Sequence, residues 1–169
     1  MRFSNTITID RKPAAVFGYL ADLENLPEWN YAIQQTRKVT AGPVGVGSRY
    51  LQTRTIPVHR QEGLEVIEFD PDRSLTLRGS LNSFPALINY TLRPDGNTTA
   101  LTNTVDLQPP RAPNLLAPIA THRIQSAVAA NLNVLKQTLE QSLRPDRHAR
   151  MHLRASDTDS VFYPQGAMR

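Results

Sequence analysis

Two changes in the spacing of apolar residues divide the chain into three parts. In the first part, residues 3–9 alternate apolar and polar side chains, which is typical of a half-buried strand. Pro13 then opens an apolar run that predicts a helix over residues 13–20, because proline is well placed in a first helical turn. A second short helix or turn is predicted over residues 23–30.

From residue 31 to residue 107 the apolar positions recur with a period of two, and turn-forming residues separate the runs. This pattern predicts six further strands, at about 32–40, 47–56, 59–69, 74–81, 84–93 and 98–107. The gaps between these strands are short. Short connections favour an antiparallel meander, because parallel strands need long crossovers.

The third pattern is that of one long helix over residues 115–143. Its apolar stripe recurs every three or four positions: Ile124, Val128, Leu132, Leu135, Leu139 and Leu143. A single stripe predicts a helix that packs on the sheet. Residues 144–169 are polar, rich in arginine and without a period, so we expect a disordered tail after a domain that spans residues 1–143.

Composition narrows the class of protein. The chain has 169 residues, enough for one ordinary domain, and it has no cysteine, which excludes disulfides and thiolate metal sites. The net charge is +4 and the arginines are scattered, whereas nucleic-acid binding requires a concentrated basic face, so we expect no nucleic-acid partner. We expect no membrane span and no export signal, and therefore a cytoplasmic protein, because the sequence holds no long apolar run.

The order of elements and four stretches of sequence resemble the polyketide cyclase/dehydrase-like group of the SRPBCC (START/Bet v 1-like) superfamily. The stretches are residues 16–30 (VFGYLADLENLPEWN), 42–50 (GPVGVGSRY), 68–73 (EFDPDR) and 131–136 (NLNVLK). The resemblance covers residues 3–143. It implies an α+β helix-grip fold, in which a seven-stranded curved antiparallel sheet wraps around a long C-terminal helix. One helix is too narrow to fill a deeply curved sheet, so an apolar cavity is expected as well.

The alternation of side chains along the strands identifies polar residues that could face such a cavity. In strand 98–107, Asn103 shares the parity of Leu101 and Val105, and a buried amide needs hydrogen-bond partners. A ligand is one possible partner, and a neighbouring strand or helix is the alternative. Tyr90 shares the apolar face of strand 84–93, where it either offers its hydroxyl to the cavity or packs in the core.

The sequence does not determine which face of strand 47–56 points inward, because both faces mix polar and apolar residues. Tyr50, Gln52 and Arg54 share one face. If this face points inward, Arg54 is a cavity cation able to hold a carboxylate or an enolate. If it points outward, Arg54 is a solvated surface charge, which is the commoner state of arginine.

Three further residues are cavity candidates. Trp29 lies near the expected cavity mouth, although a lone tryptophan also serves as a packing anchor, and Asn131 borders the stripe of the long helix. His59 begins a strand, where it is either a general base or a residue at a loop edge. The spacing of His148 and His152 fits a metal ion on a helix, but both lie in the predicted tail, so no metal and no cofactor is predicted.

Three functions are consistent with these features. The leading hypothesis is a protein that binds a small hydrophobic ligand, such as a lipid, a polyketide or an aromatic metabolite, in an internal cavity. The second is a polyketide cyclase or dehydratase, which must position a poly-β-ketone and stabilise an enolate. The third is a protein-interaction module. Two convergent titratable groups in the cavity would favour the enzyme, and an apolar cavity with one or two hydrogen-bonding groups would favour binding.

Deletion of residues 146–169 should leave the melting temperature nearly unchanged, because a polar segment without a period has no apolar face to pack on the domain. Thermal unfolding of the full chain and of the truncated chain, followed by circular dichroism, measures the difference. A drop of many degrees would show instead that the region around Phe162 docks on the domain.

Overall fold

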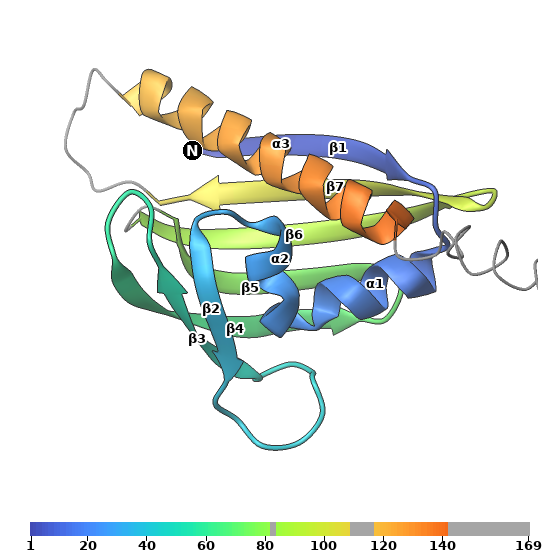
Figure 1. Cartoon of the computed structure of the whole chain (residues 1–169), viewed down its shortest axis with the longest axis horizontal. Helices are drawn as coiled ribbons and strands as arrows, with labels where there is room; N and C mark the ends of the chain where they lie inside the picture. The colour runs from blue at the N-terminus through green and yellow to red at the C-terminus, as the bar shows by residue number, and fades with distance from the viewer. Residues whose placement is uncertain (82–83, 109–116, 142–169) are drawn as a thin grey trace, which may run out of the picture.

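A single curved sheet and one long helix dominate the computed structural model, which describes residues 1–81, 84–108 and 117–141 (Figure 1). The sheet has seven antiparallel strands in the order β1-β7-β6-β5-β4-β3-β2. These strands are β1 (Arg2–Ile9), β2 (Ile33–Lys38), β3 (Arg49–Arg54), β4 (Arg60–Asp70), β5 (Ser74–Leu81), β6 (Phe84–Asp95) and β7 (Thr98–Leu107). The predicted α+β helix-grip fold is confirmed.

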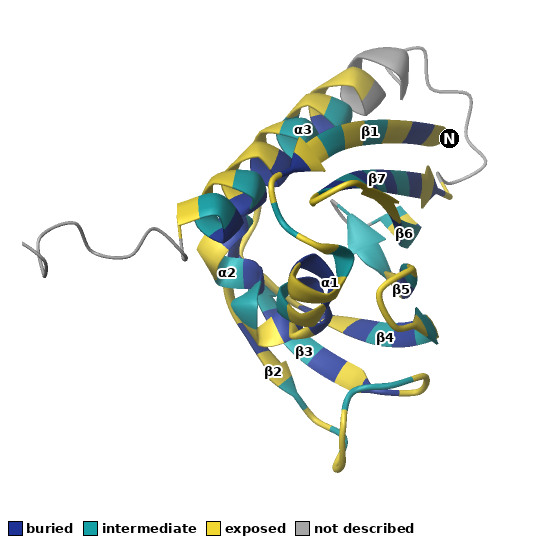
Figure 2. Ribbon diagram, turned by 90° about the vertical axis from the view of Figure 1, so that its right-hand side faces the viewer, coloured by how far each residue is buried: buried dark blue, intermediate teal, exposed yellow. Residues whose placement is uncertain are grey.

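All the helices lie on the concave side of the sheet (Figure 2). Helix α1 (Pro13–Ala21), the short 3-10 helix η1 (Leu23–Asn25) and helix α2 (Leu26–Trp29) connect β1 to β2. Helix α3 (Ala117–Gln141) runs along β1 and reaches α2. Pro13 occupies the first turn of α1, where no intrahelical N–H bond is lost, as the sequence predicts.

Strand alternation determines which side chains meet the helices. In β7, Leu101, Asn103 and Val105 are buried on the concave face, and Thr102 and Thr104 lie between them on the other face. The hydroxyls of these two threonines each share a hydrogen bond with a hydroxyl of β1, at 3.0 Å and 2.9 Å. The predicted parity of this strand is therefore correct.

The stripe of α3 also faces the sheet. Ile124, Leu132, Leu135 and Leu139 are buried and Val128 is half-buried, whereas Leu143 lies outside the described residues. The predicted helix 115–143 extends past α3 at both ends, and residues 115–116 and 142–143 lie outside the described part of the chain. The same holds for the predicted tail, including His148 and His152. No described helix combines the length and the apolar character that a membrane crossing requires.

The core is concentrated where α1 and α2 cover the sheet. Trp29 is 5% exposed and belongs to this main cluster, together with Leu20, Leu64 and Leu132. A smaller cluster lies under the first half of α3: Phe3, Ala86, Val105, Leu107 and Ile124. The cavity described below borders this smaller cluster, because Ile124 lines it together with Leu81, Phe84 and Val128, which pack against the cluster.

Replacement of Leu132 by alanine should lower the free energy of unfolding by about 2–5 kcal/mol, because the side chain is fully buried in the main cluster. Urea denaturation measures the change. Asn133→Ala is the control, since Asn133 is the next residue and is exposed, and it should cost less than about 0.5 kcal/mol. A loss near zero for Leu132→Ala would contradict the packing of α3 on the sheet.

Candidate functional site

A cavity of about 730 Å³ opens where the α2–β2 and β3–β4 connections approach the first half of α3. Its volume lies in the range of small-molecule binding sites. Most of its lining is apolar: Ala32, Ile56, Pro57, Leu81, Phe84, Ile124, Ala127 and Val128. The polar residues of the described lining are Asn30, Tyr31, Arg54, Arg123 and Asn131.

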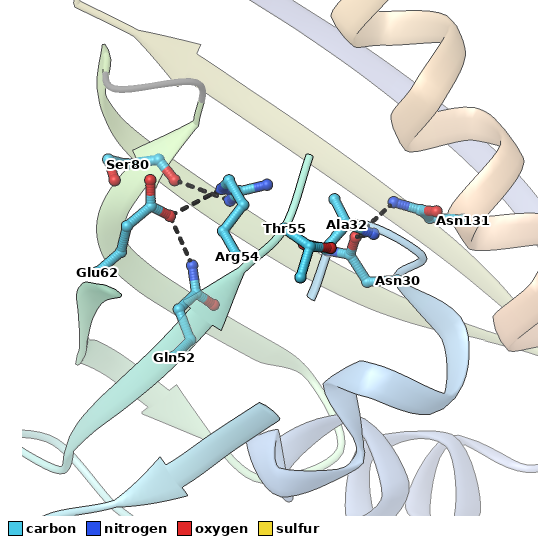
Figure 3. A network of polar contacts seen from close by, with 8 residues as sticks. All are labelled: Asn30, Ala32, Gln52, Arg54, Thr55, Glu62, Ser80 and Asn131. Atoms are coloured by element: carbon cyan, nitrogen blue, oxygen red, sulfur yellow. Dashed lines mark hydrogen bonds and ion pairs between the residues drawn. The ribbon is translucent and has the colours of Figure 1, made fainter. Parts of the chain in front are cut away.

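Arg54 is a buried residue of this lining and belongs to a buried ion pair (Figure 3); the part of the cavity next to Arg54 is called its inner end below. Arg54 Nε donates to Glu62 Oε2 at 2.9 Å, and the two side chains are only 6% and 3% exposed. Gln52 Nε2 donates to the same carboxylate oxygen at 3.0 Å. Arg54 Nη2 makes a longer contact of 3.5 Å with the carbonyl oxygen of Ser80.

The register of β3 and β4 explains why these polar residues meet. Gln52 lies directly opposite Glu62, and Tyr50 lies opposite Leu64. Along both strands the inward side chains therefore change from apolar to polar in the direction of the cavity. Arg54 is the last residue of β3, so its side chain reaches the cavity from the end of the strand.

The expectation from base rates that Arg54 is a surface charge is wrong. Arg54 is 5% exposed, and the face of β3 that carries it points inward. The physical reason is the Glu62 carboxylate on the neighbouring strand, because a buried guanidinium is tolerated when it is paired and hydrogen-bonded. The open question of which face of β3 points inward is thereby resolved.

A second polar contact joins the cavity wall to α3. Ala32 N–H donates to Asn30 Oδ1 at 3.2 Å, and Asn131 Nδ2 donates to the same oxygen at 3.0 Å (Figure 3). A backbone N–H can only donate, so the Asn30 atom that it meets must be the oxygen. The Asn131 atom that meets this oxygen must then be the amide nitrogen. This chain of contacts fixes the orientation of both amides.

This orientation leaves an acceptor and a donor on the cavity lining. Asn131 Oδ1 is buried and has no hydrogen-bond partner among the described residues. Arg54 uses Nε and Nη2, and its Nη1 makes no hydrogen bond with any described residue. Among the buried residues of the described lining, Arg54 therefore offers an N–H donor group and Asn131 a carbonyl acceptor.

Two of the predicted site residues lie in the core instead of the cavity lining. Tyr90 is 6% exposed in the main cluster, and burial raises the pKa of its hydroxyl, so it stays protonated at neutral pH. Asn103 is 1% exposed, and its Nδ2 donates to the carbonyl oxygen of Asn89 at 3.3 Å, which is the structural hydrogen bond given above as the alternative. Asn103 Oδ1 has no partner among the described residues.

The other three predicted residues also lie away from the lining. Trp29 and Tyr50 are packed in the main cluster, with exposed fractions of 5% and 2%. Burial, followed by the charges of Asp22 and Glu24, raises the pKa of the Tyr50 hydroxyl. His59 is exposed in the β3–β4 connection. Of the seven predicted residues, the structure thus brings Arg54 and Asn131 together on the cavity lining.

Sequence reasoning missed Glu62 and Asn30. A signal for Glu62 existed, because it has the same parity as Leu64 and Val66, so an inward carboxylate could be expected to have a charged partner. Asn30 gave no comparable signal, since its role depends on a contact with a residue 101 positions away. Within the described ranges, no three acidic or histidine side chains come together as a metal site.

Comparison with known proteins identifies the family. The chain matches the family described as polyketide cyclase/dehydrase and lipid transport over residues 1–140. It belongs to this family. The predicted resemblance to the polyketide cyclase-like group of the SRPBCC superfamily is therefore confirmed. No curated protein gives a significant match to the chain.

Solved structures of this superfamily are similar in fold. A START superfamily protein from Mycobacterium smegmatis is 14% identical, with a TM-score of 0.67 over 82% of this chain and 98% of that chain. The Zhui aromatase/cyclase from a Streptomyces species is 14% identical, with a TM-score of 0.70 over 85% and 96%. The di-domain aromatase/cyclase BexL is 16% identical, with a TM-score of 0.70 over 86% of this chain and 48% of that chain. At these identities the similarity shows the fold.

Glu62→Gln should lower the free energy of unfolding by about 3–5 kcal/mol, because it leaves the buried Arg54 guanidinium without a counter-charge. Urea denaturation measures the loss. The double variant Arg54→Met/Glu62→Leu should recover most of it, because it buries no charge.

Glu65→Gln is the matched control on the same strand. Glu65 pairs with Arg49 and Arg78, whose side chains are 68% and 62% exposed, and such pairs contribute at most about 1 kcal/mol. Equal losses for Glu62→Gln and Glu65→Gln would contradict the desolvated state of the Arg54–Glu62 pair.

Proposed function

We propose that the protein binds a small, mainly apolar molecule in the 730 Å³ cavity, with Arg54 and Asn131 as its polar contacts. The observation that carries this proposal is the described lining, which combines apolar walls with a donor group on the buried Arg54 and the buried acceptor Asn131 Oδ1. Apolar walls supply affinity, and a few placed polar groups fix the orientation of the ligand. The family description, which includes lipid transport, supports the same function.

The donor and the acceptor on the lining determine which hydrogen-bonding groups the ligand needs. Arg54 Nη1 requires an acceptor, such as a carbonyl or hydroxyl oxygen. Asn131 Oδ1 requires a donor, such as a hydroxyl group. Because Asn30 and Ala32 fix the amide of Asn131, this acceptor is preorganised and loses little freedom on binding. A lipid, polyketide or aromatic metabolite that carries a carbonyl and a hydroxyl group meets both requirements.

Catalysis of cyclisation or dehydration is the second candidate, because the family description includes both reactions and Arg54 could stabilise an enolate oxygen. The described lining residues include no histidine, aspartate or glutamate that could accept a proton. Arginine does not serve as a base, because it stays protonated in proteins. By the criterion of two convergent titratable groups, the described lining favours binding over catalysis.

The neutral fluorophore Nile red should bind with increased emission, since the cavity offers an apolar environment. Titrations of 2-naphthol against bound Nile red then test Asn131. In Asn131→Leu, the affinity for 2-naphthol should fall about two- to tenfold through loss of one hydrogen bond, while the affinity for naphthalene should be retained.

The matched control is Asn133→Leu, because Asn133 lies on the exposed side of the same helix and should leave both affinities unchanged. Thermal melting of both variants checks that the fold is retained. Absence of Nile red binding would refute the proposed function. Turnover of a poly-β-ketone that Arg54→Ala abolishes without unfolding would favour the enzyme instead.

A further inference from the structure

The charge of the inner end of the cavity bears on the class of ligand. Arg54 is a permanent cation, and an isolated guanidinium in an apolar cavity would attract a carboxylate or a phosphate. Here the carboxylate of Glu62 lies 2.9 Å from Arg54 Nε, and both side chains are more than nine-tenths buried. The inner end therefore carries a hydrogen-bond donor without a net charge.

We infer that the ligand presents an uncharged acceptor oxygen to Arg54, and that Glu62 excludes carboxylates and phosphates from this end of the cavity. This inference rests on the proposed function and names the chemical class of its ligand. The polar end of the ligand is then the oxygen of a ketone, an ester, an amide or an alcohol.

The first reason is the cost of desolvation. An anion that enters the apolar lining gives up its hydration, and only a strong local field of opposite sign repays this loss. The Glu62 charge cancels most of the field of Arg54, because the two charges are in direct contact. A neutral carbonyl loses much less hydration and still gains a hydrogen bond from a charged donor.

The second reason is the direction of the remaining polar atoms. Glu62 Oε2 already accepts from Arg54 and Gln52, whereas Glu62 Oε1 is buried without a partner among the described residues. An anion bound to Arg54 would add a second negative charge close to this carboxylate, and one guanidinium cannot neutralise both charges in a medium of low polarity. The same carboxylate does not repel an uncharged oxygen in this way.

The mouth of the cavity differs from the inner end. Arg123 lines the mouth from α3 and is exposed, and no carboxylate of a described residue lies within ion-pair distance of it. Its charge is screened by solvent, so it attracts anions only weakly. Discrimination by charge is therefore assigned to the Arg54–Glu62 pair.

Two ligands of the same ring system test the inference: 2-acetylnaphthalene, which is a neutral ketone, and 2-naphthoate, which is an anion. Isothermal titration calorimetry gives both dissociation constants for the full chain. The wild-type protein should bind 2-acetylnaphthalene at least about tenfold more tightly than 2-naphthoate. Equal or tighter binding of 2-naphthoate overturns the inference.

Glu62→Gln is the decisive variant, because it removes the opposing charge and keeps the size of the side chain. Its affinity for 2-naphthoate should rise by about tenfold or more, while its affinity for 2-acetylnaphthalene should change by less than about threefold. The control Glu65→Gln should keep the wild-type preference, since Glu65 pairs with exposed arginines. No gain of 2-naphthoate affinity in folded Glu62→Gln overturns the inference.

If Glu62→Gln does not fold, the double variant Arg54→Met/Glu62→Leu replaces it, because it buries no charge. This variant should bind 2-acetylnaphthalene about tenfold more weakly and 2-naphthoate no better than the wild-type protein does. Unchanged binding of the ketone overturns the inference. A wild-type protein that binds Nile red but prefers 2-naphthoate refutes only the charge rule, whereas a protein that binds none of the three probes refutes the proposed function as well.

Discussion

The site depends on a constraint of packing, namely that the helices do not fill the whole concave face of a seven-stranded curved sheet. Helices α1 and α2 complete the core at one end, where Trp29, Leu64 and Leu132 meet. Beyond Leu64 the inward residue of β4 is Glu62, and beyond Tyr50 the inward residues of β3 are Gln52 and Arg54. These polar side chains take one another as partners instead of contributing to the apolar core. The cavity lies next to these side chains. The polar residues at the end of β3 and at the start of β4 therefore mark the limit of the apolar core.

The ion pair between Arg54 and Glu62 lowers the electrostatic free energy of burying these polar residues. Either charge alone would be expensive at an exposure of 6% or less, and together they form a neutral unit. The pair still leaves N–H groups of Arg54 for a partner in the cavity, because a guanidinium has five donors and Glu62 takes one of them. A neutral unit of this kind differs from a lone arginine in what it selects. It forms a hydrogen bond with an acceptor oxygen that lies in the right direction, and it adds little electrostatic attraction for a negatively charged group.

Much of the fold could be predicted from the sequence, because strand alternation and the α3 stripe are local properties. The seven strands and the inward parity of Leu101, Asn103 and Val105 follow from periodicity. The site was harder to predict. Strand alternation tells which face of the sheet a side chain lies on, but not whether it lies in the core or beside the cavity. Tyr90 has the correct inward parity and still lies in the core. Arg54 could not be assigned at all, because its burial depends on Glu62. The predicted meander pairs β3 with β4, but it does not give the register that brings Arg54 and Glu62 together.

This difference between local and non-local information bears on how ligand class can be inferred in this family. The fold is shared at identities of 14–16%, so it indicates little about the ligand. The lining of the cavity is more informative, but Arg54 by itself would point to an anion. Only the residue behind it, Glu62, which is not part of the lining, changes that reading to an uncharged oxygen. In the proposed function, specificity for charge is therefore set one layer behind the surface that the ligand touches, by the ion-pair partner of the lining residue on the neighbouring strand.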